Sequence, residues 1–306
     1  MNLLPKNQTN LYGLEKYFLE LKYLYTKEKL PNKILLTGQK GIGKSTLAYH
    51  FINFVLSKNE VSCYDTENLK INSDNKSYKL ILNTTHTNFY LIDLGNEKKN
   101  IDISQIRELI SYVNKSSFNQ SPRFVLIDNI EFLNINSVNA LLKVLEEPNT
   151  NIHFILINNN KKILDTLKSR CINFKIHLEN DKSISIANKL LDNKLNKLVN
   201  DELLSYYTTP GNIYNLVKFS NENDLDLKDL PLKNFLTFLI ENNYYKKDSP
   251  IRYMFYDFFE LFLTKKIIKD NSKSFNSFLK KIDNVKKFNL DQESLFIEFQ
   301  SKILNV

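Results

Sequence analysis

The 306 residues of this chain are 42% hydrophobic and 25% charged, which is typical of a globular protein with two or three domains. The most apolar stretch, residues 251–268, is interrupted by five charged side chains, which argues against a membrane span. The two cysteines suggest no disulfide framework and cannot form a four-ligand zinc site with each other, and no secretory signal pattern starts the sequence. We therefore expect a cytoplasmic protein without zinc and without a membrane partner.

The net charge of +8 at pH 7 invites a nucleic-acid interpretation. Only four of the 42 basic residues are arginine, however, and the lysines are scattered along the chain rather than gathered into one block. We attribute the excess to a compositional bias toward lysine, asparagine and isoleucine, and leave weak contact with a phosphate backbone open.

A glycine-rich loop is the strongest signal near the start of the chain. An expected helix over residues 14–24, stopped by Pro31, comes first, and a buried strand over residues 34–37 leads into the loop. Residues 38–46 read GQKGIGKST, which fits G-x-x-x-x-G-K-[ST] and holds three of the six glycines of the chain. A plain strand-to-helix turn, the alternative, seldom needs three glycines followed by Lys-Ser. We therefore predict a nucleotide phosphate loop, followed by a helix to about Leu56.

The chemistry of such a loop accounts for its residue types. Glycines let successive backbone N–H groups point inward, and the N-terminus of the following helix favours negative charge. We expect Lys44 to reach the β- and γ-phosphates of ATP, and Ser45 to hold Mg²⁺. The candidate nucleotide-binding residues in this loop are Gly38, Gly41, Gly43, Lys44, Ser45 and Thr46.

The next segment carries weaker signals. Residues 57–87 are polar and predict a loop with one short strand near residues 80–82. Residues 89–92 predict a second strand, and the apolar spacing over residues 103–113 predicts a helix.

An apolar run at residues 123–128 ends in an aspartate. A central parallel strand of this kind delivers its last side chain to the carboxyl edge of the sheet, where the phosphate loop also lies. Asp128 is thus the natural second residue for Mg²⁺, acting through water. Its alternative role is to cap the next helix. With the loop upstream, we favour the metal role.

Three further elements complete the α/β pattern. A helix capped by Asn136 or Ser137 and ended by Pro148 precedes a buried strand at residues 153–157, which Asn158 and Asn159 follow. If this strand neighbours the Asp128 strand, one of these amides, for which we choose Asn159, lies beside the γ-phosphate. A short helix at residues 163–168 and a last strand at 172–176 follow.

Strands alternating with helices over residues 30–177 predict an α/β parallel sheet domain. Beyond it the strand signal stops, and the chain becomes helical and rich in phenylalanine and tyrosine, a composition that suits a core or an interface. We predict a nucleotide-binding domain at 1–177, a small helical lid at 178–227 and an all-α C-terminal domain at 228–306.

The order of these features resembles the AAA+ P-loop ATPases of the bacterial DNA polymerase III clamp loader. ALLKVLEEP at residues 140–148 and SRC at residues 169–171 look like hallmark segments of that family. The resemblance covers residues 1 to about 178 well and the helical remainder loosely. It implies a C-terminal collar domain that assembles a hetero-oligomeric ring with other clamp-loader subunits. Through that complex it implies a sliding clamp and primer-template DNA as partners, and it implies ATP and Mg²⁺ as ligands.

Departures from the motor subunits make the chain more similar to the delta-prime subunits. The family's ATPases usually carry Asp-Glu where this chain has Asp128 and Asn129, and an amide cannot act as a general base. Glu131 lies two residues further on and need not point the same way. The lid lacks an arginine near the Thr-Pro-Gly step at 209–211, and residues 57–87, where many members carry a zinc module, hold only Cys63. ATP binding is therefore expected, with weak or absent ATPase activity.

The resemblance also assigns a role to Arg170. In the family, the arginine of the SRC segment acts in trans, because it projects into the nucleotide site of a neighbouring subunit. Its alternative role is a cation that satisfies the last carbonyls of a helix. Because the chain has few arginines, we favour the finger. Two other functions stay open: a motor ATPase in which Glu131 replaces the missing base, and a self-contained P-loop kinase or NTPase.

Overall fold

The structure is a computed structural model that describes residues 3–94, 100–115, 121–147, 151–204, 207–247, 250–270, 273–288 and 291–304. The chain divides into two compact units, residues 1–178 and residues 179–306, and each unit is described by itself.

The first unit is built on a five-stranded sheet in which every neighbouring pair is parallel, in the order β2-β3-β4-β1-β5. Every residue of β3 and β4 is buried, as expected for inner strands of a parallel sheet covered on both faces. The predicted α/β parallel sheet is confirmed. Its strands are β1 (Lys33–Thr37), β2 (Phe89–Ile92), β3 (Arg123–Ile127), β4 (Ile152–Asn158) and β5 (Ile172–Lys175).

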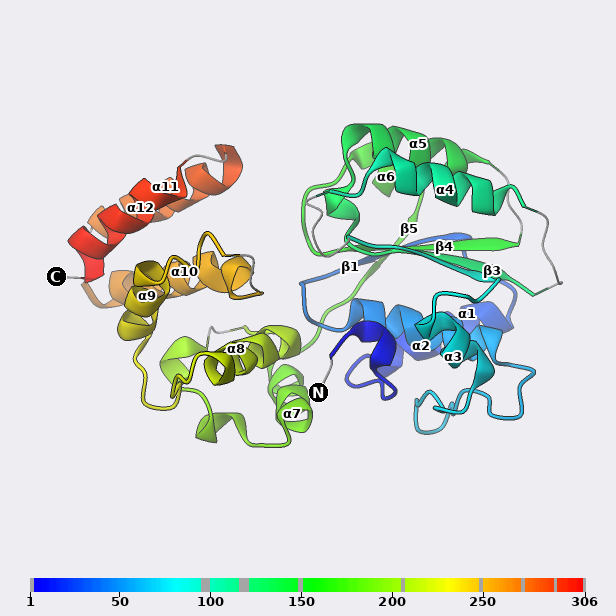
Figure 1. Cartoon of the computed structure of the whole chain (residues 1–306), viewed down its shortest axis with the longest axis horizontal. Coiled ribbons are helices and arrows are strands. Elements are labelled where there is room, and N and C mark those ends of the chain that lie inside the picture. The colour runs from blue at the N-terminus through cyan, green and yellow to red at the C-terminus, as the bar shows by residue number, and fades with distance from the viewer. Residues whose placement is uncertain are drawn as a thin grey trace. The chain divides into compact units, whose positions relative to one another are not determined.

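Helices cover both faces of this sheet (Figure 1). One face carries α1 (Glu15–Thr26), α2 (Lys44–Leu56) and α3 (Lys76–Leu82), and the other carries α4 (Ile103–Val113), α5 (Ile135–Glu146) and α6 (Asp165–Lys168). Short 3₁₀ turns lie at Pro5–Asn7 and Ile130–Phe132. The helix predicted to follow the phosphate loop is confirmed as α2, which ends at Leu56.

The strand predicted near residues 80–82 is wrong, because these residues end the helix α3. Tyr78 and Ile81 are both buried, and this spacing of three fits a helix rather than a strand. The sequence carries a start signal in Asn75, whose side chain accepts a hydrogen bond from Tyr78 N at 2.7 Å. This cap and the tertiary contacts of the segment then outweigh the strand-like apolar run at residues 80–82.

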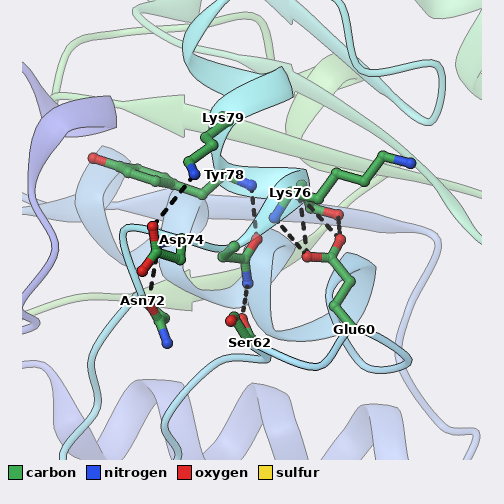
Figure 2. A network of polar contacts seen from close by, with 9 residues as sticks. Glu60, Ser62, Asn72, Asp74, Lys76, Tyr78 and Lys79 are labelled. Carbon is green, nitrogen blue, oxygen red and sulfur yellow. Dashed lines mark hydrogen bonds and ion pairs between the residues drawn. The ribbon is translucent and has the colours of Figure 1, made fainter.

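Glu60 completes the N-terminus of α3 from a distant part of the loop, as Figure 2 shows. Its carboxylate accepts hydrogen bonds from Lys76 N at 2.7 Å and Ser77 N at 3.0 Å, and also from the Ser77 hydroxyl. The first N–H groups of a helix have no partner within the helix. A carboxylate there accepts hydrogen bonds from them, and its negative charge interacts favourably with the positive end of the helix dipole.

The cap of α5 also differs from the prediction. The N-cap is Asn134, whose side chain accepts from Ser137 N at 2.9 Å, rather than Asn136 or Ser137. Ser137 instead donates its hydroxyl to the Ile101 carbonyl at 2.9 Å, which ties the first turn of α5 to the segment before α4. Pro148, predicted to end this helix, lies outside the described residues.

The second unit contains only helices and turns among its described residues. One hydrophobic cluster extends from Ala187 to Leu304, with phenylalanine rings in direct contact, such as Phe259 and Phe299 at a centroid distance of 4.3 Å. The predicted helical C-terminal part is confirmed, whereas its division into lid and collar stays a prediction. Its helices are α7 (Asn180–Leu191), α8 (Pro210–Glu222), α9 (Leu232–Glu241), α10 (Pro250–Asp270), α11 (Lys273–Phe288) and α12 (Gln292–Phe299), with 3₁₀ turns at Leu195–Lys197 and Asp201–Leu203 and a π turn at Gln300–Leu304.

Across the described ranges, no helix is long and apolar enough to cross a membrane.

The contacts of Glu60 predict that its side chain contributes measurably to the free energy of unfolding. Glu60→Ala removes the acceptor for two backbone N–H groups of α3, and should lower the free energy of unfolding by about 1–2 kcal/mol. Denaturant unfolding followed by circular dichroism measures this loss. Glu67→Ala, at an exposed position of the same loop, serves as the control and should change it by less than about 0.5 kcal/mol. Equal effects of the two variants would contradict the stabilising role assigned to Glu60 at the N-terminus of α3.

Candidate functional site

The backbone of the phosphate loop requires glycine for two different reasons. Gly41 and Gly43 have φ angles of 87° and 94°, in the left-handed region that side chains disfavour. At Gly38 the constraint is space, because a Cβ atom there would lie 2.5 Å from the carbonyl oxygen of Ile176. The loop is therefore closely fitted against the segment that follows β5, and any side chain at residue 38 would displace it.

Lys44 is buried at the start of α2, with 3% of its surface exposed. Its ammonium group donates to the carbonyls of Gly38 at 2.9 Å and Gln39 at 2.6 Å, and to Asn159 Oδ1 at 2.9 Å. Burial lowers the pKa of Lys44 to about 8, and the charge of Asp128 opposes this shift. The structure thus brings Lys44 and Asn159, two predicted site residues, into direct contact.

Ser45 and Asp128, the two residues predicted for Mg²⁺, also meet. The Ser45 hydroxyl donates to Asp128 Oδ2, and Asp128 Oδ1 accepts from the backbone N–H of Asn129 at 2.8 Å. Burial raises the pKa of Asp128 to about 6, with the nearby charge of Asp93 adding to the effect. Thr46 follows Ser45 in the first turn of α2 and is half-buried.

A chain of side-chain amides and carboxylates extends from Asn159 across the edge of the sheet. Asn159 Nδ2 donates to Asn129 Oδ1 at 2.9 Å and to Glu131 Oε1 at 2.8 Å. Asn129 in turn donates its Nδ2 to Asp93 Oδ1 at 2.8 Å. The side chain of Asn129, which stands where the resembled ATPases carry a glutamate, is therefore engaged on both sides.

Two carboxylates in this arrangement were not assigned to the nucleotide site from the sequence, although Glu131 was considered as a replacement for the missing base. Asp93 directly follows the apolar strand β2, which is the same pattern that singled out Asp128 after β3. The sequence held this signal for Asp93. Glu131 carries no such signal, because it lies within a 3₁₀ turn, and only the fold shows that its carboxylate points at Asn159.

Arg170 lies apart from this network, just after the short helix α6. Its Nε donates to Glu146 Oε1 at 3.0 Å, Nη2 contacts the same oxygen, and Nη1 donates to the Thr166 carbonyl at 2.7 Å. The contact with Thr166 is the helix-terminal role considered as the alternative to the finger. The side chain keeps 32% of its surface exposed.

These residues fit a magnesium nucleotide. The edge of the sheet offers a glycine loop, an ammonium group, and a hydroxyl paired with a carboxylate. Among the described residues, no group of three or more His, Cys, Asp or Glu could hold a metal ion. With Ser45 and Asp128 beside it, a Mg²⁺ ion would take several of its ligands from the nucleotide phosphates, as is usual for this metal. The expected absence of zinc stays a prediction.

A model of a protein family matches the part of the chain that contains the candidate site. The family model described as "DNA polymerase III, delta subunit" matches residues 13–180, more than half of the chain. The chain belongs to this family. The match contains the phosphate loop, Asp128, Asn159 and Arg170, and so includes every candidate site residue predicted from the sequence.

Individual relatives of this DNA polymerase III family are similar over shorter stretches. DNA polymerase III subunit delta' of Pseudomonas aeruginosa is 32% identical over 139 residues, which cover 45% of this chain and 40% of that protein. The corresponding protein of Buchnera aphidicola is 30% identical over 171 residues, 53% of this chain and 49% of that protein. The chain thus spans about half the length, or less, of these curated relatives.

One solved structure is similar over more of the chain but with lower identity. A DNA polymerase III gamma subunit-related protein of Thermotoga maritima has 17% identity and a TM-score of 0.42, and the comparison covers 92% of this chain and 97% of that one. The fold class accordingly rests on the sheet and helices of this chain.

The raised pKa of Asp128 predicts how stability depends on pH. In the unfolded chain this aspartate has a pKa near 4, so between about pH 4 and pH 6 the folded state binds more protons and loses stability as pH rises. Asp128→Asn removes the ionisable carboxyl group, and with it this loss of stability. The variant should be about 2–3 kcal/mol more stable than the unmodified chain at pH 7, and the difference should shrink to about 1 kcal/mol at pH 4.5.

Urea unfolding at the two pH values measures this difference. Asp165→Asn is the control, since the side chain of Asp165 is 96% exposed, and it should change stability equally little at both values. A destabilised Asp128→Asn chain at pH 7 would contradict the assignment of a desolvated carboxylate with a raised pKa.

Proposed function

We propose that this chain is a delta-prime-like subunit of a DNA polymerase III clamp loader, with a role in DNA replication. It joins other clamp-loader subunits in a hetero-oligomeric AAA+ ring through its helical C-terminal part. That ring uses ATP to load a sliding clamp on primer-template DNA. The observation that carries the proposal is an assembled phosphate loop beside Asn129, an amide hydrogen-bonded to both Asn159 and Asp93.

In this proposal the chain's own site holds a nucleotide rather than hydrolysing it. Lys44 contacts the phosphates after exchanging its present carbonyl partners for them, and Ser45 and Asp128 orient Mg²⁺. When bound there, Mg²⁺ would supply positive charge that neutralises the phosphates. Asn159 keeps the Lys44 ammonium directed at the loop. An amide at position 129 cannot take a proton from water, so the step that needs a general base is slow at this site.

Arg170 serves the neighbouring subunit. Its guanidinium is charged at every physiological pH and has a fork of donors that matches phosphate geometry. It is partly exposed at the end of a short helix, where a second chain can reach it. In related NTPases an arginine supplied in trans raises the rate of hydrolysis by about a thousandfold or more.

Removing this arginine tests the proposal. In a complex assembled with clamp-loader subunits of the same organism, Arg170→Ala should lower the ATP turnover stimulated by clamp and DNA by about a hundredfold or more. Co-elution of the subunits should persist. Arg107→Ala, which alters another exposed arginine of the same unit, is the matched control and should leave turnover unchanged. Full turnover with Arg170→Ala would refute the finger.

A second candidate is a hydrolytically active motor subunit, and the position of Glu131 favours it. Its carboxylate lies within hydrogen-bonding distance of Asn159, at the edge of the sheet where a water would be activated. This alternative predicts steady-state hydrolysis by the lone subunit, lost in both Lys44→Ala and Glu131→Gln. The delta-prime-like function predicts that Glu131→Gln leaves a negligible rate unchanged.

A further inference from the structure

Arg170 is held in place by its own chain. Three of its N–H groups are engaged, because Nε and Nη2 meet one carboxylate oxygen of Glu146 and Nη1 meets the Thr166 carbonyl. A guanidinium carries five N–H donors in one rigid plane. Two donors, one on each terminal nitrogen, thus remain for an anion while the contacts to Glu146 and Thr166 persist.

Both ends of the Arg170–Glu146 pair are fixed in the core of the first unit. Leu145 precedes Glu146 at the end of α5, Cys171 follows Arg170, and Leu167 lies in α6. All three are buried in the same hydrophobic cluster. Helices α5 and α6 pack against each other on one face of the sheet (Figure 1). The ion pair therefore joins two anchored points of the backbone rather than two mobile segments.

We propose that Glu146 is a positioning residue that orients Arg170 for the nucleotide site of a neighbouring subunit. This inference rests on the proposed action of Arg170 in trans and adds a second residue to it. Glu146 does not contact the nucleotide. It fixes the plane of the guanidinium, and with it the direction of the two remaining donors.

Physical reasoning favours orientation over stability as the role of this pair. Arg170 is partly exposed, at 32%, and Glu146 is exposed, at 54%, and an ion pair in such surroundings adds little to folding. A free arginine, however, has many rotamers, which must be given up when it meets a phosphate. Holding the guanidinium in place before it meets the phosphate removes that loss of conformational entropy. Displacement of a catalytic group by about 1 Å can slow a reaction a hundredfold.

Glu147 offers a matched control, because it is the next residue, is also exposed, and carries the same charge. In the assembled complex, Glu146→Ala should lower kcat for ATP about tenfold, a loss set by misplacement of Arg170. KM should change by less than about twofold. Glu146→Gln keeps an acceptor oxygen and should recover kcat to within about threefold of the unmodified complex. Glu147→Ala should match the unmodified complex.

A double variant separates positioning from a general structural effect. If Glu146 acts through Arg170, Arg170→Ala with Glu146→Ala should turn over no more slowly than Arg170→Ala alone. Additive losses would overturn the inference. So would normal kcat for Glu146→Ala in a complex that Arg170→Ala impairs, and this result leaves the finger standing. Normal kcat for Arg170→Ala instead refutes the proposed function, and the role of Glu146 with it.

Discussion

Charge is buried at the carboxyl edge of a parallel sheet, and the candidate site depends on that arrangement. Lys44 and Asp128 both lose most of their water there, and each is moved away from its ordinary pKa, toward about 8 and about 6. Such a pair is tolerable only where hydrogen bonds replace the water. Loop carbonyls, the Ser45 hydroxyl and Asn159 supply these bonds, and an anionic ligand with a cation would complete them.

The strand order explains how a few side chains connect the two sides of the candidate site. β4 lies between β1, which leads into the phosphate loop, and β3, which leads into Asp128. Asn159, just beyond β4, can therefore reach both Lys44 and the residues after β3. One amide side chain in this position links the phosphate-binding side of the site to its acidic side.

The sequence predicted the fold and the gathering of Lys44, Ser45, Asp128 and Asn159 at one edge of the sheet, because the carboxyl ends of parallel strands meet at that edge whatever the intervening loops do. It could not place Glu131 or Glu146, since their contacts depend on how a 3₁₀ turn and two helix ends pack. The prediction of a strand in the segment before β2 was wrong for a similar reason. Its apolar residues suit a strand locally, and the cap by Asn75 and the contact with Glu60, 16 residues before Lys76, make it a helix.

We propose that this chain holds a nucleotide without hydrolysing it, and equilibrium binding followed by a chase tests this most directly. Isolated protein is mixed with Mg²⁺ and radiolabelled ATP, the bound stoichiometry is measured, and the bound label is then analysed over several hours. We predict one nucleotide per chain, recovered as ATP. Absence of binding, or label recovered as ADP and phosphate over many turnovers, would contradict the account.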